Sequence, residues 1–71
     1  MQEFVVRGEY ITLGQLVKAV NEVSSGGEVK EYLANNAPIV NGEVENRRGR
    51  KLRPGDVVQF EGVGEIRCIS P

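Results

Sequence analysis

Apolar residues recur with helical spacing along the first half of the chain. The first set consists of Leu13, Leu16, Val17 and Val20. These positions follow the i, i+3, i+4, i+7 pattern and therefore share one face of a helix. Thr12 is followed three residues later by Gln15, which is the pattern of a capping box, so the helix is expected to start at Thr12. Gly14 in its first turn weakens the helical tendency slightly.

A second helical pattern follows after a short link at about residues 21–24. Its apolar stripe is Val29, Tyr32 and Leu33. Ser25 and Glu28 form another capping-box pair, and the asparagines at 35–36 are suited to ending the helix. Because the link is so short, the two helices are expected to pack as a helical hairpin.

Outside the helices, the pattern changes to short β-branched and alternating runs, which are typical of strands. The expected strands lie within residues 1–8, 39–40, 43–45, 56–60 and 65–70. Asn41-Gly42 tolerates the positive φ angles of a type I′ hairpin turn, and Pro54-Gly55 suits the centre of a type II turn. In the strand at 43–45, alternation with Val44 predicts that Glu43 and Glu45 share an exposed face.

These elements predict a single α+β domain over residues 1–71. Two short N-terminal helices are expected to pack on a small, mostly antiparallel sheet of four or five short strands. A chain of 71 residues is near the size at which one core is only just sufficient. The sequence has neither an apolar run long enough to span a membrane nor a signal-peptide pattern, so a cytoplasmic protein with no membrane partner is expected.

Charge is distributed very unevenly. The net charge is -1, yet five of the nine basic residues fall within residues 47–53: Arg47, Arg48, Arg50, Lys51 and Arg53. We call residues 47–53 the basic segment. The rest of the chain carries four basic residues against all ten acidic residues. An acidic body with one concentrated basic segment indicates a localised anion-binding surface.

Catalysis is not expected from this composition. The chain has no histidine, which excludes Ser–His and Cys–His nucleophile pairs and Cys/His metal sites. The one cysteine, Cys68, lies in an apolar strand pattern and is expected to be a buried small hydrophobe instead of a reactive thiol. Neither a cofactor nor a metal is predicted.

Two features are suited to binding an anion. Residues 24–27 read SSGG at the predicted start of the second helix, where free N–H groups favour negative charge. The candidate residues there are Ser25, Gly26 and Gly27, with Lys30 one turn later on the same side. The second feature is the basic segment, because arginine forks match phosphate oxygens. The competing interpretations are an ordinary helix cap and a solvated loop. Since basic and aromatic residues are not interleaved, phosphate and shape contacts are predicted in preference to base stacking.

From residue 24 to residue 60, the chain resembles the S4-type RNA-binding domain, the αL motif. The matching positions are Ser25, Val29, Tyr32-Leu33, Val40-Asn41-Gly42 and Gly55-Asp56-Val57. The core motif covers about residues 12–60. The run from Glu43 to Lys51 is similar to that of small stand-alone bacterial members. One departure is Gly26, where the family often has an arginine, so that arginine's phosphate contact is not carried over.

The resemblance implies a non-catalytic protein whose partner is structured RNA, with ribosomal RNA or an assembling ribosomal particle as the setting, and a monomer is expected. Two alternatives stay open. A β-grasp sulfur carrier has similar length and turn motifs, but it needs a C-terminal Gly-Gly, whereas this chain ends Cys-Ile-Ser-Pro. A protein-binding adaptor would use the basic segment on an acidic partner.

Overall fold

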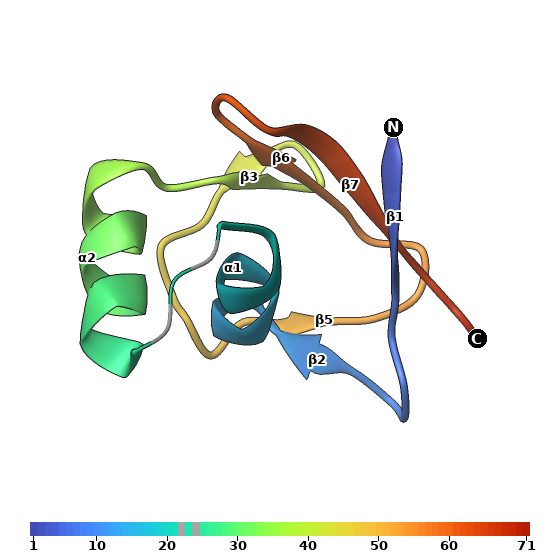
Figure 1. The fold of residues 1–71 in the computed structure, drawn as a ribbon. Coiled ribbons are helices and arrows are strands. Elements are labelled where there is room, and N and C mark those ends of the chain that lie inside the picture. Colours follow the sequence, from blue (N-terminus) through green and yellow to red (C-terminus); the bar gives the residue numbers. More distant parts are fainter. Residues whose placement is uncertain (22, 24) are drawn as a thin grey trace.

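The chain folds as two helices on one side of a five-stranded sheet (Figure 1), which confirms the predicted α+β class. The computed structural model describes residues 1–21, 23 and 25–71. The helices are α1 (Leu13–Asn21) and α2 (Gly26–Asn35). The strand order is β1 (Gln2–Val5), β7 (Gly64–Ile69), β6 (Val57–Phe60), β3 (Ile39–Val40) and β4 (Glu43–Val44). Only β1 and β7 are parallel, so the sheet is mostly antiparallel as expected.

A second, two-stranded sheet was not predicted. It consists of β2 (Ile11–Thr12) and β5 (Lys51–Leu52), which run antiparallel with Ile11 opposite Leu52 and Thr12 opposite Lys51. β3 and β4 are equally short, but the Asn41-Gly42 turn between them marks them in the sequence. β2 and β5 have no such turn between them, and two residues alone carry too little alternation to be recognised. This small sheet joins the start of α1 to the basic segment.

The predicted capping box at Thr12 is present with both of its hydrogen bonds, and at Ser25 the predicted N-cap hydrogen bond is present. The Thr12 N–H donates to Gln15 Oε1, and the Gln15 N–H donates to Thr12 Oγ1. At α2, Ser25 is the N-cap and its Oγ accepts the Glu28 N–H at 3.2 Å. The helix ends at Asn35 with Asn36 as C-cap. The expected link at 21–24 includes residues 22 and 24, which lie outside the described residues.

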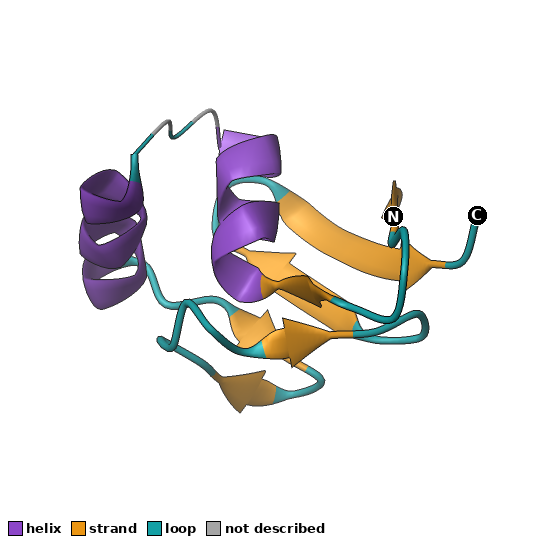
Figure 2. Ribbon diagram, turned by 90° about the horizontal axis from the view of Figure 1, so that it is seen from below, coloured by secondary structure: helices purple, strands orange, loops and turns teal. Residues whose placement is uncertain are grey.

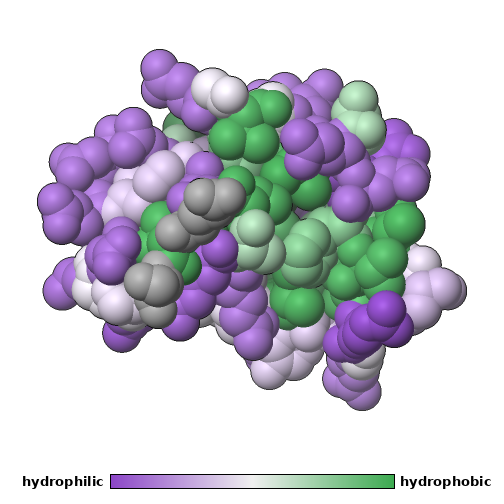
Figure 3. Space-filling view, in the orientation of Figure 1, coloured by the Kyte–Doolittle hydropathy of each residue, from purple (hydrophilic) through white to green (hydrophobic). Residues whose placement is uncertain are grey.

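The core forms where the apolar helix faces meet the sheet. The buried side chains are Val6, Leu13, Leu16, Val17, Val29, Leu33, Val40, Leu52, Val58, Phe60, Ile66 and Cys68. This confirms the predicted helical stripes, with Val20 and Tyr32 only half-buried at their edges. Figure 2 shows the two helices side by side, and Figure 3 shows apolar side chains gathered between α1 and β1. None of the helices that the structure describes has the length and apolar character to cross a bilayer.

The two predicted turns are confirmed by their backbone angles. Asn41 and Gly42 have φ of 50° and 87°, as a type I′ turn between β3 and β4 requires. At the end of the basic segment, the Asp56 N–H donates to the Arg53 carbonyl at 3.0 Å, and Gly55 has φ of 103°. That combination is a type II turn with Pro54-Gly55 at its centre.

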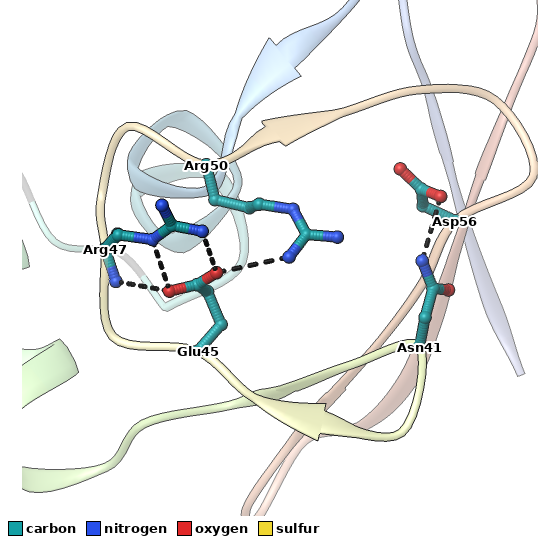
Figure 4. A network of polar contacts seen from close by, with 5 residues as sticks. All are labelled: Asn41, Glu45, Arg47, Arg50 and Asp56. Atoms are coloured by element: carbon teal, nitrogen blue, oxygen red, sulfur yellow. Dashed lines mark hydrogen bonds and ion pairs between the residues drawn. The ribbon is translucent and has the colours of Figure 1, made fainter.

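The Asn41 side chain joins these two turns. Its Nδ2 donates to Asp56 Oδ1 at 3.0 Å, and its Oδ1 accepts the Val57 N–H at 2.9 Å. The other carboxylate oxygen of Asp56 accepts the Arg53 N–H at 2.8 Å. Figure 4 shows the Asn41–Asp56 contact. The Val-Asn-Gly and Gly-Asp motifs therefore act as one clasp, which fixes the end of the basic segment against the sheet.

The predicted exposed face of Glu43 and Glu45 is wrong for Glu45. β4 ends at Val44, which is 73% exposed, whereas Glu45 is only 8% exposed. The two-residue edge strand stops before alternation can continue. The Glu45 N–H then donates to the Pro38 carbonyl at 2.9 Å, and the side chain turns toward Arg47 and Arg50. Glu43 is exposed, as predicted.

We predict that Asn41→Ala lowers the free energy of unfolding by roughly 1–3 kcal/mol, because it removes two hydrogen bonds and places alanine at a positive φ. Urea denaturation measures this change. Asn46→Ala is the matched control, because it makes the same chemical change at an exposed position. Its free energy of unfolding should stay within about 0.5 kcal/mol of the wild-type value. Equal effects of the two substitutions would contradict the clasp.

Candidate nucleic-acid interface

The basic segment is bound to the first turn of α1 through its backbone. The Leu13 N–H donates to the Arg50 carbonyl and the Gly14 N–H to the Arg48 carbonyl, both at 2.8 Å. These N–H groups lack acceptors within their own helix. The carbonyl groups of the basic segment accept these hydrogen bonds, and the helix thereby fixes the path of the segment. It is therefore an integral part of the fold, not a freely moving loop.

Gly14 allows this close approach. A Cβ atom added at Gly14 would lie 3.2 Å from the Arg48 carbonyl oxygen and 3.3 Å from Arg48 Cβ. Both distances are shorter than ordinary van der Waals contact. The same atom would be 3.5 Å from a methyl group of Val29 in α2. The glycine, which only weakens the helical pattern in the sequence, thus lets α1, α2 and the basic segment pack closely against one another.

The Glu45 carboxylate, just before the basic segment, pairs with two of its arginines (Figure 4). Its carboxylate accepts hydrogen bonds from the Arg47 backbone N–H, from Arg47 Nε and from one Arg47 terminal nitrogen, at 3.0 to 3.1 Å. Arg50 adds a further bond at 3.2 Å. These bonds lower the pKa of Glu45 from 4.5 to about 2. The Arg47 side chain is the main cause, and the Arg47 backbone N–H is the next. A buried carboxylate thus stays ionised between two guanidinium groups.

This pairing changes the charge available at the surface. The sequence places five positive charges in the basic segment. Two of them, on Arg47 and Arg50, share the Glu45 carboxylate, so Glu45 reduces the repulsion among the five. Arg48, Lys51 and Arg53 are exposed and make no ion pair with Glu45. Arg47 itself keeps 73% of its side chain exposed.

A groove of about 310 Å³ lies between the first turns of the two helices and the basic segment. It is lined by Thr12, Gly14, Gln15, Lys18, Gly26, Val29, Arg48 and Gly49. A terminal nitrogen of Arg48 lies 3.5 Å from the Gly26 carbonyl oxygen. Lys18 adds a positive charge that sequence reasoning missed. Its spacing of one helical turn from Gly14 and Gln15 was the available signal, because such residues share a face.

A shallow basic concavity of about 480 Å³ adjoins the groove. Its lining consists of Arg47, Gly49, Arg50, Lys51 and Arg53. Gly49 lines both spaces, so they form one continuous surface. We call the groove and the concavity together the basic surface. The structure therefore brings all five predicted residues of the basic segment onto one surface.

The predicted helix-start residues only partly join this surface. Gly26 lines the groove. Ser25 uses its hydroxyl within the cap, where it accepts the Glu28 N–H and donates to the Glu28 carboxylate. Gly27 and Lys30 are exposed, but neither is among the described residues that line the groove. Of this group, only Gly26 is brought next to the basic segment.

Cys68 is fully buried, as predicted. Burial, with the nearby Asp56 charge as a smaller cause, raises the pKa of its thiol. A raised pKa disfavours the nucleophilic thiolate. Within residues 1–21, 23 and 25–71, no three His, Cys, Asp or Glu side chains are grouped so that they could hold a metal ion.

Comparison with known proteins identifies the family to which the chain is similar. The family model described as S4 domain matches residues 4–68. A protein of Bacillus subtilis (strain 168) is 47% identical over 62 residues, which cover 87% of each chain. That relative bears the name "Probable ribosome maturation protein RlbA".

We predict opposite effects for two glycines in helical first turns. Gly14→Ala should lower the free energy of unfolding by about 1–2 kcal/mol, because the new methyl group meets the Arg48 backbone. Gly27→Ala meets no atom within 4 Å, so it should raise that free energy by roughly 0.5 kcal/mol through helix propensity. Thermal or urea unfolding measures both. Stabilisation by Gly14→Ala would rule out the close approach.

We predict that Glu45→Gln lowers the free energy of unfolding at pH 7 by on the order of 2 kcal/mol, allowing for the solvent exposure of Arg47. Because folding lowers the pKa of Glu45, the wild-type advantage is present above pH 4.5 and is lost as the pH falls toward about 2. Urea unfolding of both proteins at several pH values measures this.

Glu43→Gln, at an exposed position in β4, is the control and should change the stability at pH 7 by less than about 0.5 kcal/mol. A stability difference between wild type and Glu45→Gln that does not vary with pH would contradict the role assigned to the carboxylate.

Proposed function

The chain belongs to the S4 domain family, and from that premise we propose that it is a non-catalytic protein that binds structured RNA. The ligand is ribosomal RNA or an assembling ribosomal particle in the cytoplasm of a bacterium. The protein acts as a monomer and grips phosphates through the basic surface. Membership of this family also removes the β-grasp alternative.

The observation that carries this proposal is the continuous basic surface on an otherwise acidic protein. Guanidinium groups match phosphate oxygens in shape and charge. In the basic segment, bonds to α1 hold the backbone in place, and the Glu45 carboxylate orients the guanidinium groups of Arg47 and Arg50. A rigid array of cations binds a preformed array of phosphates with little loss of conformational freedom. Folded RNA presents such an array.

The composition supports binding without catalysis. The chain has no histidine, and its only thiol is buried with a raised pKa. General acid–base and nucleophilic chemistry most often draw on these groups. The cations of the basic surface are suited to neutralising phosphate charge.

The ribosomal setting is supported by the relative from Bacillus subtilis. Its printed name refers to ribosome maturation. The two sequences share 47% identity over 87% of each chain. A small domain that binds folded RNA without altering it chemically is suited to such a role.

We predict that binding to a structured RNA weakens steeply with salt. If all five cations of the basic segment contact phosphate, log K falls against log[salt] with a slope of about -3.5, and with three contacts of about -2, taking ~0.7 per contact. Electrophoretic mobility shift or fluorescence anisotropy at several salt concentrations measures the slope. A flat salt response would contradict the proposal.

The most informative variant replaces Arg48, Lys51 and Arg53 together by alanine, because none of them pairs with Glu45. The fold should persist, and the salt slope should become less negative by about 2. Arg67→Ala is the matched control: Arg67 is exposed on β7, outside the basic surface, and its replacement should leave the slope unchanged.

A further inference from the structure

An aromatic ring lies beside the basic surface. Tyr10 immediately precedes β2, and its ring centroid is 5.1 Å from Lys51 Nζ and 5.9 Å from Arg53 Cζ. Both distances fall within the range of a cation–π contact. Despite these neighbours, Tyr10 remains 40% exposed. The ring is therefore held by two cations while part of it still faces solvent.

The pairing of β2 with β5 explains this position. Ile11 lies opposite Leu52, and Leu52 is fully buried, so these two residues face the core. Side chains alternate between the two faces along a strand. The residues next to them in sequence therefore belong to the outward face. These are Tyr10 beside Ile11, and Lys51 and Arg53 on either side of Leu52.

This arrangement alters the expectation from sequence. Basic and aromatic residues are not interleaved along the chain, which argued for phosphate and shape contacts alone. The fold interleaves them in space, because a cross-strand pairing joins segments that are distant in sequence. Lys51 and Arg53 both lie over the ring, and 40% of Tyr10 is still exposed. A partly exposed ring next to cations is the combination that stacking sites for single-stranded nucleic acid use.

We propose that Tyr10 is a stacking platform for one unpaired nucleotide of the bound RNA. The base lies against the exposed part of the ring, and Lys51 and Arg53 hold the flanking phosphates. This inference rests on the proposed RNA-binding function and adds to it a preference for RNA in which an unpaired nucleotide adjoins a helix. Every base has a π face, so the site is not selective for base identity.

A structural role for Tyr10 has a different consequence. If the ring only covers the aliphatic stems of Lys51 and Arg53, any apolar side chain of similar size serves. Leucine provides that cover but has no π face, whereas phenylalanine keeps the π face without the hydroxyl. Comparing Tyr10→Leu with Tyr10→Phe therefore isolates stacking.

The test compares a short blunt RNA hairpin with the same hairpin carrying a short unpaired tail, both measured by fluorescence anisotropy. Wild type and Tyr10→Phe should bind the tailed RNA about tenfold more tightly than Tyr10→Leu does, as expected for one stacked base. All three proteins should bind the blunt hairpin equally, since its phosphate contacts do not involve the ring.

Equal affinity of Tyr10→Leu and wild type for the tailed RNA overturns the stacking site and leaves the proposed function standing. Failure of wild type to bind either hairpin at low salt overturns both. A weaker affinity of Tyr10→Leu for the blunt hairpin as well shows a structural effect and also overturns the stacking site.

A spectroscopic readout gives an independent answer. The chain has no tryptophan, so Tyr10→Trp introduces a single reporter that keeps an aromatic face. Its fluorescence should be quenched by the tailed hairpin and not by the blunt one. Val44→Trp, at a position 73% exposed in β4, is the matched control and should respond to neither. Equal quenching of Tyr10→Trp by both hairpins contradicts the stacking site.

Discussion

The first N–H groups of α1 need acceptors, and the basic segment supplies them. The Gly14 and Leu13 amides donate to the carbonyls of Arg48 and Arg50 at 2.8 Å. Many features of the structure follow from this docking. It needs a glycine at position 14, it places the Arg48 side chain beside the start of α2, and it exposes Gly49 where the groove and the concavity meet. The same hydrogen bonds therefore cap α1 and position the candidate interface.

The charges of the basic segment are balanced in part by the Glu45 carboxylate. Five cations in seven residues would repel one another, and the buried Glu45 carboxylate offsets part of that repulsion from below. The outer surface stays positive, because a single carboxylate serves two arginines. At the far end of the segment, the Asn41–Asp56 clasp holds the Arg53 backbone. The backbone of the segment is thus held near its start, middle and end, and its charges face solvent.

Local patterns allowed much of the fold to be predicted. The two capping boxes, the apolar helical stripes and the Asn-Gly and Pro-Gly turns each depend on residues within a few positions of one another. The missed features depend on contacts between distant segments. Glu45 is the exception, because Arg47 and Arg50, which turn it inward, are near neighbours in the chain. β2 and β5 are defined only by their pairing, and Lys18 and Tyr10 reach the basic surface through tertiary packing. Such contacts leave no periodic signal in a single sequence.

In the cell, the basic surface is proposed to bind folded RNA. Ultraviolet crosslinking in living cells, with sequencing of the bound RNA and mapping of the crosslinked peptides, tests it most directly. If the basic surface binds folded RNA, structured ribosomal RNA is recovered, with the adducts on residues 47–53. Recovery of a protein partner and no RNA, or adducts confined to the outer face of the sheet, would contradict it.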